Sequence, residues 1–130
     1  MAVSKQYHLL LVADDHDQSD LFTLVLERAG YRVTAVLTGE EALGLIAAQS
    51  FDLILTDYML PDFNGDVLIE KVRGRGITTK IVMMSNHVDV AMIARESKAD
   101  AFYRKDDIFQ LVRLVNSLLP SNGSAVTSAA

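Results

Sequence analysis

Residues 51–57 read FDLILTD, a mostly apolar run of strand length that ends in a carboxylate. A strand that is apolar on both faces is typical of the centre of a parallel sheet, where helices cover each side. Asp57 follows this run directly, so its charge is expected at the carboxyl-terminal edge of the sheet. Ligands of open parallel sheets bind outside this edge. The stretch therefore predicts both a sheet architecture and the place where its chemistry lies.

Other runs of strand length occur along the chain, with helical patterns between them. The predicted strands cover residues 8–13, 31–36, 51–56, 80–84 and 100–103, and the predicted helices cover 17–29, 38–49, 66–73, 88–96 and 106–119. Alternating strands and helices are the signature of a parallel sheet with helices on both faces. The sequence thus predicts an α/β domain built from five strand-helix units.

Polar residues and glycines mark the ends of the predicted helices. Asp17 is expected to cap the first helix, and Gly30 is expected to end it. Thr38 and Glu41 have the Thr-x-x-Glu spacing of a capping box at the start of the second helix. The turn residues PDFNG at 61–65 predict a loop before the third helix.

Length and composition limit the classes of protein to which the chain can belong. Its 130 residues suit one domain, expected over residues 1–120, with 121–130 as a disordered tail or the start of a linker. The chain has no cysteine, which excludes disulfides and thiolate metal sites and fits a reducing cytoplasm. No apolar run approaches the ~20 residues of a membrane span, so a cytoplasmic protein without membrane association is expected.

The charge pattern argues against direct binding to nucleic acid. The formal net charge is −5, and the Lys and Arg residues are scattered, whereas phosphate neutralisation needs clustered basic residues. The stretch RGRG at 73–76 neither follows an apolar strand nor has the lysine-hydroxyl ending of a nucleotide-binding loop, so it is interpreted as a turn.

Polar residues follow four of the five predicted strands. Asp14 and Asp15 come after the first, Asp57 after the third, Ser85 after the fourth and Lys105 after the fifth. Because the carboxyl ends of parallel strands meet at one edge of the sheet, these side chains are expected to converge.

Three acids at one edge predict a bound cation. Two carboxylates ~4 Å apart repel by about 1 kcal/mol in bulk water and about 4 kcal/mol at an effective dielectric near 20. All-oxygen ligands favour Mg²⁺, for which Mn²⁺ can substitute, with Asp15 and Asp57 as direct ligands and Asp14 beside them. A metal-bound carboxylate is also a nucleophile towards phosphorus, so Asp57 is expected to form an aspartyl phosphate. Lys105 and Ser85 are expected to contact the phosphoryl oxygens.

Taken together, these motifs closely resemble the receiver domain of two-component response regulators, over residues 8–119. Asp14-Asp15 resembles the acidic pair of that family, Asp57 its phosphoacceptor, Ser85 its switch hydroxyl and Lys105 its lysine. The loop after the acceptor matches as well, in Leu60-Pro61 and Asn64-Gly65.

The resemblance implies a flavodoxin-like fold with strand order 2-1-3-4-5. It implies a histidine kinase or histidine phosphotransfer protein as phosphoryl donor, a downstream effector protein or domain as partner, and it allows a homodimer on phosphorylation. It also implies that the carbonyl of Met59 ligates the metal and that Phe102 is an aromatic switch residue. Two positions depart from the family pattern: Asn86 replaces a small residue after the switch hydroxyl, and Asp106 follows the lysine where proline is common.

Two other functions compete with this signalling switch, which is expected to catalyse only its own phosphorylation and dephosphorylation. One is a phosphorylation-independent interaction module of the same fold, against which the intact set of acids, hydroxyl and lysine argues. The other is a Mg²⁺-dependent phosphohydrolase, which ranks last because the sequence shows no separate general acid or base. The histidines at positions 8, 16 and 87 lack metal-ligand spacing.

Overall fold

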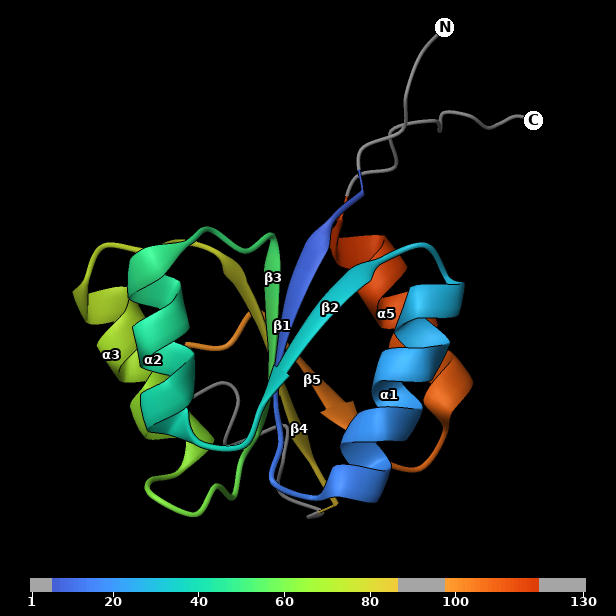
Figure 1. Ribbon diagram of the computed structural model, residues 1–130, viewed down its shortest axis with the longest axis horizontal. Helices are drawn as coiled ribbons and strands as arrows, with labels where there is room; N and C mark the ends of the chain where they lie inside the picture. Colours follow the sequence, from blue (N-terminus) through green and yellow to red (C-terminus); the bar gives the residue numbers. More distant parts are fainter. Residues whose placement is uncertain (1–5, 87–97, 120–130) are drawn as a thin grey trace, which may run out of the picture.

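The structure is a computed structural model that describes residues 6–86 and 98–119. Its elements are β1 (His8–Val12), α1 (His16–Arg28), β2 (Arg32–Val36), α2 (Gly39–Ala48), β3 (Leu53–Asp57), α3 (Gly65–Gly74), β4 (Lys80–Ser85), β5 (Ala101–Arg104) and α5 (Ile108–Leu118) (Figure 1). The helix predicted over residues 88–96 and the tail predicted over 121–130 lie outside the described residues.

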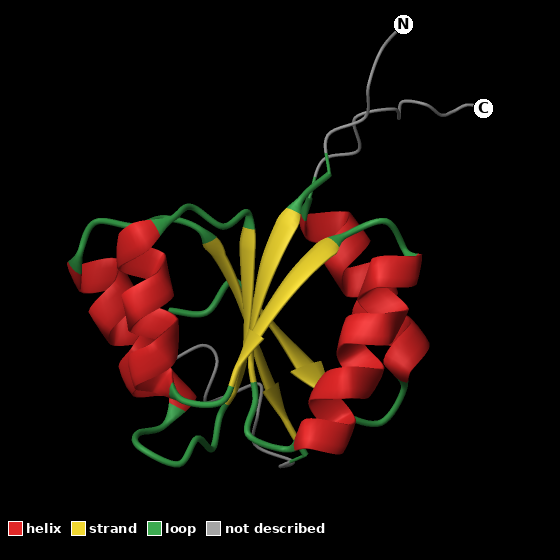
Figure 2. Ribbon diagram, in the orientation of Figure 1, coloured by secondary structure: helices red, strands yellow, loops and turns green. Residues whose placement is uncertain are grey.

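The described strands form one parallel sheet in the order β2-β1-β3-β4-β5. Helices α1 and α5 cover one face of the sheet and α2 and α3 cover the other, which makes three layers (Figures 1 and 2). The expected flavodoxin-like α/β fold with strand order 2-1-3-4-5 is therefore confirmed. Strand β3 lies at the centre, hydrogen-bonded to β1 and to β4.

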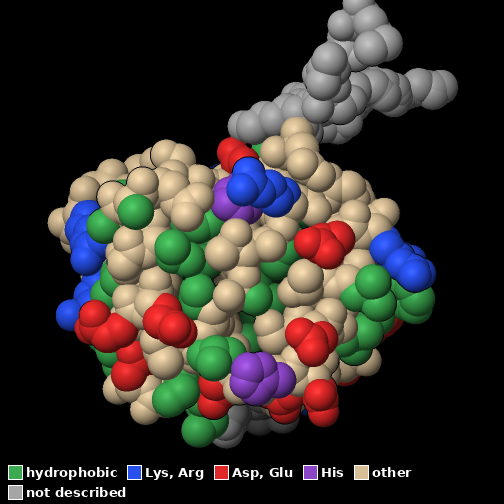
Figure 3. Space-filling model, viewed as in Figure 1, with side chains coloured by type: hydrophobic (Ala, Val, Ile, Leu, Met, Phe, Trp, Pro, Cys, Tyr) green, Lys and Arg blue, Asp and Glu red, His purple; other side chains and the backbone are tan. Residues whose placement is uncertain are grey.

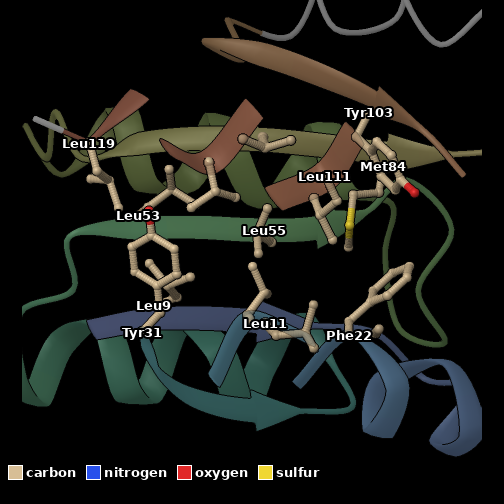
Figure 4. Packing of buried hydrophobic residues seen from close by; sticks show 14 residues of the cluster. Leu9, Leu11, Phe22, Tyr31, Leu53, Leu55, Met84, Tyr103, Leu111 and Leu119 are labelled. Carbon is tan, nitrogen blue, oxygen red and sulfur yellow. The ribbon is translucent and has the colours of Figure 1, made fainter. Parts of the chain in front are cut away.

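Each central strand contributes side chains to two hydrophobic cores. Leu53 and Leu55 of β3 point towards α1 and α5, in the core drawn in Figure 4, while Ile54 points towards α2 and α3. All three side chains are at most 1% exposed. Burying one such side chain contributes roughly 1.5–3 kcal/mol. The apolar run at 51–57 is thus a strand buried on both faces, as predicted.

Helix α1 begins earlier than the sequence predicted. Its N-cap is Asp15, whose backbone is extended (φ −89°, ψ 112°) and whose Oδ1 accepts a hydrogen bond from the Gln18 amide at 3.1 Å. The prediction that Asp17 caps this helix was wrong, because a cap needs a non-helical backbone and Asp17 already lies in the first turn. There its charge faces the positive end of the helix dipole.

The other predicted helix ends agree more closely. Thr38 Oγ1 accepts a hydrogen bond from the Glu41 amide at 3.1 Å, so Thr38 is the cap of α2 as predicted, while Glu41 Oε1 accepts from the Leu37 amide at 2.9 Å in place of the Thr38 amide of a full capping box. Gly30 follows α1 with φ +103°, a left-handed conformation that favours glycine. Helix α5 begins two residues later than predicted because Asp107, with an extended backbone, is its N-cap and accepts a hydrogen bond from the Phe109 amide at 3.0 Å.

Candidate functional site

A cavity of about 320 Å³ opens at the carboxyl edge of the sheet, the lower edge in Figure 1. Six of the seven predicted site residues line it, and the seventh, Phe102, does not. Its lining residues are Asp14, Asp15, Gln18, Asp57, Met59, Met84, Ser85, Asn86 and Lys105. Residues that are far apart in the sequence therefore meet at one place, as the topology of a parallel sheet requires.

The sheet itself holds the central acid in place. Asp57 is the last residue of β3 and is only 4% exposed. The amide of the following Tyr58 donates to the Met84 carbonyl at 2.8 Å, which continues the pairing with β4. Ser85 ends β4 and is also buried, and its carbonyl accepts a hydrogen bond from the Lys105 amide at 3.2 Å. Backbone hydrogen bonds thus position the carboxylate, the hydroxyl and the lysine relative to one another.

Lys105 forms an ion pair with Asp57 through Nζ and Oδ1; the Asp57 side chain is buried and that of Lys105 is mostly buried. Lys105 Nζ also donates a hydrogen bond of 2.6 Å to Gln18 Oε1. Asp57 Oδ1 makes no hydrogen bond to the other described groups. Among residues 6–86 and 98–119, Lys105 is thus the cation that compensates the charge of the buried carboxylate.

Burial raises the pKa of Asp57 above the usual value of a carboxyl. The hydrogen bond and charge of Lys105 oppose this shift, and the negative charges of Asp14 and Asp15 add to it. The two flanking acids are exposed at the mouth of the cavity. The edge is therefore a place where added positive charge stabilises the folded chain.

The oxygen atoms at this edge suit a hard divalent cation. Among the described residues, no group of three or more acid or histidine side chains is arranged to hold an ion alone. Two carboxylates, one backbone carbonyl and several waters are, however, the mixed ligand set that Mg²⁺ accepts. Asp15, Asp57 and Met59 line the cavity and can supply the protein part of that set. The observation that fits such an ion is the buried Asp57 carboxylate, whose charge is opposed by Lys105 but repelled by Asp14 and Asp15.

The start of α3 lies directly against the backbone of Asp57. The Gly65 amide donates to the Tyr58 carbonyl at 2.6 Å, and a Cβ added at Gly65 would lie 2.4 Å from the Asp57 carbonyl oxygen. No side chain fits in this space. The Asn64-Gly65 motif therefore has a structural reason, which is close approach of the helix to the acid-bearing strand.

The loop between β3 and α3 is anchored on helix α2, which lies beside α3 on the same face of the sheet (Figure 1). Asp62 accepts hydrogen bonds from the Gly39 amide at 3.0 Å and from the Glu40 amide at 2.8 Å, at the start of α2. Burial alone would raise the pKa of Asp62, but these bonds and that from the Phe63 amide lower it. The hydrogen bonds of Asp62 thus restrict the movement of the loop that places Met59 in the wall of the cavity.

Phe102 lies on β5 and is 44% exposed, outside the cavity. The next residue, Tyr103, points to the other face of the sheet, where it is buried and meets the Phe22 ring edge-on at 6.2 Å between centroids (Figure 4). His8, at the start of β1, lies at the opposite edge of the sheet, and His87 lies outside the described residues. Alternation along the edge strand thus decides which aromatic ring stays at the surface.

Gln18 lines the cavity although the sequence did not point to it. An uncharged amide in a helix carries no signal of a site. The position of Gln18 becomes informative only once Asp15 is known to cap α1, because Gln18 then lies in the first turn of the helix, three residues after Asp15.

The surface of the molecule agrees with the charge pattern of the sequence. On the face shown in Figure 3, acidic side chains prevail towards the lower edge, and the Lys and Arg side chains lie apart at the top and the flanks. This face therefore carries no basic patch of the kind that binds nucleic acid. No helix in the described ranges 6–86 and 98–119 has the length and apolar character to span a bilayer.

Comparison with known proteins agrees with this geometry. The family model of the response regulator receiver domain matches residues 9–119. The transcriptional regulatory protein CseB of Streptomyces coelicolor is 32% identical over 126 residues, which are 95% of this chain and 53% of CseB. The chain spans about half the length of that relative, and less of several others.

Solved structures show the same fold. A putative response regulator from Chloroflexus aurantiacus superposes with a TM-score of 0.83 at 30% identity, over 88% of this chain and 98% of its own. The response regulator TrrA of Thermotoga maritima, solved in complex with Mg²⁺-BeF, has a TM-score of 0.82 at 23% identity, over 88% and 100%. With the family match over residues 9–119 and this fold, the chain belongs to the receiver domain family of two-component response regulators.

Proposed function

We propose that the chain is a phosphorylation switch in which Asp57 accepts a phosphoryl group in a Mg²⁺-dependent reaction. The donor is the phosphohistidine of a histidine kinase or histidine phosphotransfer protein, and the output is a changed surface for an effector protein or domain. The observation that carries the proposal is the buried Asp57 carboxylate, paired with Lys105 in a cavity that two further acids also line.

Asp15, Asp57 and the Met59 carbonyl would hold the Mg²⁺, with Asp14 adding negative charge beside them, and Mn²⁺ can take its place. When bound, the cation offsets the charge of the carboxylates and of the incoming phosphoryl group. TrrA, a protein of the same fold, is solved in complex with Mg²⁺-BeF, which supports this assignment.

The proposed reaction needs little more than positioning. One oxygen of the ionised Asp57 carboxylate forms a bond to phosphorus, and the P–N bond of phosphohistidine breaks, its electron pair leaving with the imidazole nitrogen. With acetyl phosphate as donor, the P–O bond breaks and acetate leaves. The ammonium of Lys105 shifts its contact from Asp57 to a phosphoryl oxygen, where it stabilises the transferred charge.

Ser85 and Phe102 would transmit the change. The Ser85 hydroxyl, buried at the end of β4, would donate a hydrogen bond to another phosphoryl oxygen. Movement of the end of β4 would make room for the exposed ring of Phe102 on the neighbouring β5 to turn inward. Phosphorylation then shifts the population of two surface arrangements, and a partner that binds only one of them responds.

Phosphorylation with a small-molecule donor tests the proposal. The chain is incubated with Mg²⁺ and acetyl phosphate and its intact mass is measured, beside Asp57→Asn and the matched surface variant Asp20→Asn. A phosphoryl adduct is expected on the wild type and on Asp20→Asn, and none on Asp57→Asn or in EDTA. An adduct that persists in Asp57→Asn, or none on the wild type, would leave a phosphorylation-independent interaction module as the better explanation.

A further inference from the structure

Gln18 is the one neutral polar side chain on α1 that contacts the charged groups of the site among the described residues. Its Oε1 accepts a hydrogen bond of 2.6 Å from Lys105 Nζ, the same atom that pairs with Asp57. Lys105 is therefore held from two sides, by the end of β3 and by the first turn of α1. Both cavities that flank the lysine, of about 320 and 440 Å³, have Gln18 in their walls.

The backbone of Gln18 is itself fixed. Its amide donates a hydrogen bond of 3.1 Å to Asp15 Oδ1, the cap of α1. The helix cap therefore fixes the backbone from which the Gln18 side chain reaches Lys105. A lysine has a flexible stem and gains much from an acceptor that is already in place.

The phosphoryl reaction makes a specific demand on Lys105. Before transfer its ammonium compensates Asp57, and afterwards it has to contact a phosphoryl oxygen, so the ion pair with Asp57 has to loosen. The bond to Gln18 can persist through that exchange, because an ammonium has three donors. An amide oxygen also brings no negative charge that would repel the phosphoryl group.

We propose that Gln18 is a positioning residue for phosphoryl transfer: its side-chain oxygen holds Lys105 Nζ beside Asp57 while the phosphoryl group arrives. This inference rests on the proposed function, since it assigns Gln18 a part in that reaction. Gln18 acts through the lysine and does not itself contact the phosphoryl group.

The variant Gln18→Met removes the acceptor oxygen while keeping an unbranched side chain of similar length. The rate of Mg²⁺-dependent phosphorylation by acetyl phosphate is expected to fall about ten-fold, the effect of losing one hydrogen bond to a charged group. The Mg²⁺ affinity, measured by calorimetry, is expected to stay at the wild-type value, because the backbone amide of residue 18, which donates to Asp15, is unchanged by the substitution. Gln110→Met, on the exposed face of α5, is the matched control and is expected to match the wild type.

A double-mutant cycle separates positioning from a structural role. In the Lys105→Ala background, Gln18→Met is expected to change the phosphorylation rate by less than about two-fold, because the partner of Gln18 is gone. Circular dichroism melting checks that each variant is folded, and Gln18→Leu repeats the test should Gln18→Met melt below the assay temperature.

The outcomes distinguish this inference from the proposed function. If the wild type forms no Asp57-dependent adduct, both are overturned. A phosphorylated wild type with an equally fast Gln18→Met overturns only the role of Gln18. The role of Gln18 is also overturned if Gln18→Met slows phosphorylation as much in the Lys105→Ala background as in the wild type. It is overturned as well if Gln18→Met weakens Mg²⁺ binding in parallel with the rate.

Discussion

Gly65→Ala tests the close approach between α3 and the strand that carries Asp57. The added methyl carbon would lie 2.4 Å from the Asp57 carbonyl oxygen and 3.2 Å from Tyr58 Cα. Both obstacles are backbone atoms, so no side-chain rotation relieves the overlap. The first turn of α3 or the end of β3 has to move by about an ångström, and overpacking of this kind costs about 1–3 kcal/mol.

The same shift should disturb the reaction. A displacement of the Asp57 backbone by about 1 Å is expected to lower the phosphorylation rate by about 100-fold, since misplacement on that scale costs about this much in positioned reactions. Urea unfolding reports the stability, and intact-mass kinetics with acetyl phosphate and Mg²⁺ report the rate.

Gly44→Ala is the matched control for this experiment. A Cβ at Gly44 meets no atom within 4 Å, and the residue is exposed within α2. Replacing an exposed helical glycine by alanine should stabilise the chain by about 0.5–1 kcal/mol and leave the rate unchanged. A Gly65→Ala variant as stable and as reactive as Gly44→Ala would refute the reasoning, because the backbone would then have tolerated the methyl group without displacement.

Three further predictions concern the charges of the site. In metal-free buffer, Asp57→Asn should be more stable than the wild type at neutral pH, because the raised folded-state pKa of Asp57 means that its ionisation favours unfolding. This gain in stability should vanish as the pH falls below the usual carboxyl range. A difference in urea midpoint between the two proteins that does not change with pH would contradict the prediction. Asp62→Ala should show the opposite behaviour, since its folded-state pKa is lowered: the variant should be less stable than the wild type at neutral pH, and this loss should shrink as the pH falls through the lowered pKa, measured in the same way. Mg²⁺ should raise the melting temperature of the wild type but not of Asp57→Asn, and an equal rise in both would place the ion elsewhere.

The sequence predicted the structure best where a local pattern of residues is compatible with one arrangement only. A run such as FDLILTD has no polar face to expose, so burial on both faces of a parallel sheet follows from its composition. The cap at Thr38 is equally local, since its hydrogen bond joins residues three apart in the chain. The cap of α1 was misplaced because Asp14, Asp15 and Asp17 all suit the role, and only the backbone conformation of Asp15 selects it. Its side chain consequently combines a cap with the proposed ligation of Mg²⁺.

The amino-acid sequence by itself determined the fold class and the edge at which the acids, the hydroxyl and the lysine meet, because strand ends and burial follow from the order of apolar and polar residues. Only the tertiary structure decided the hydrogen bond between Gln18 and Lys105, the contact of Gly65 with Asp57 and the anchoring of Asp62 on α2. Each of these depends on where one element is set against another to within an ångström. That placement results from the packing of many side chains at once, and no short stretch of sequence encodes it.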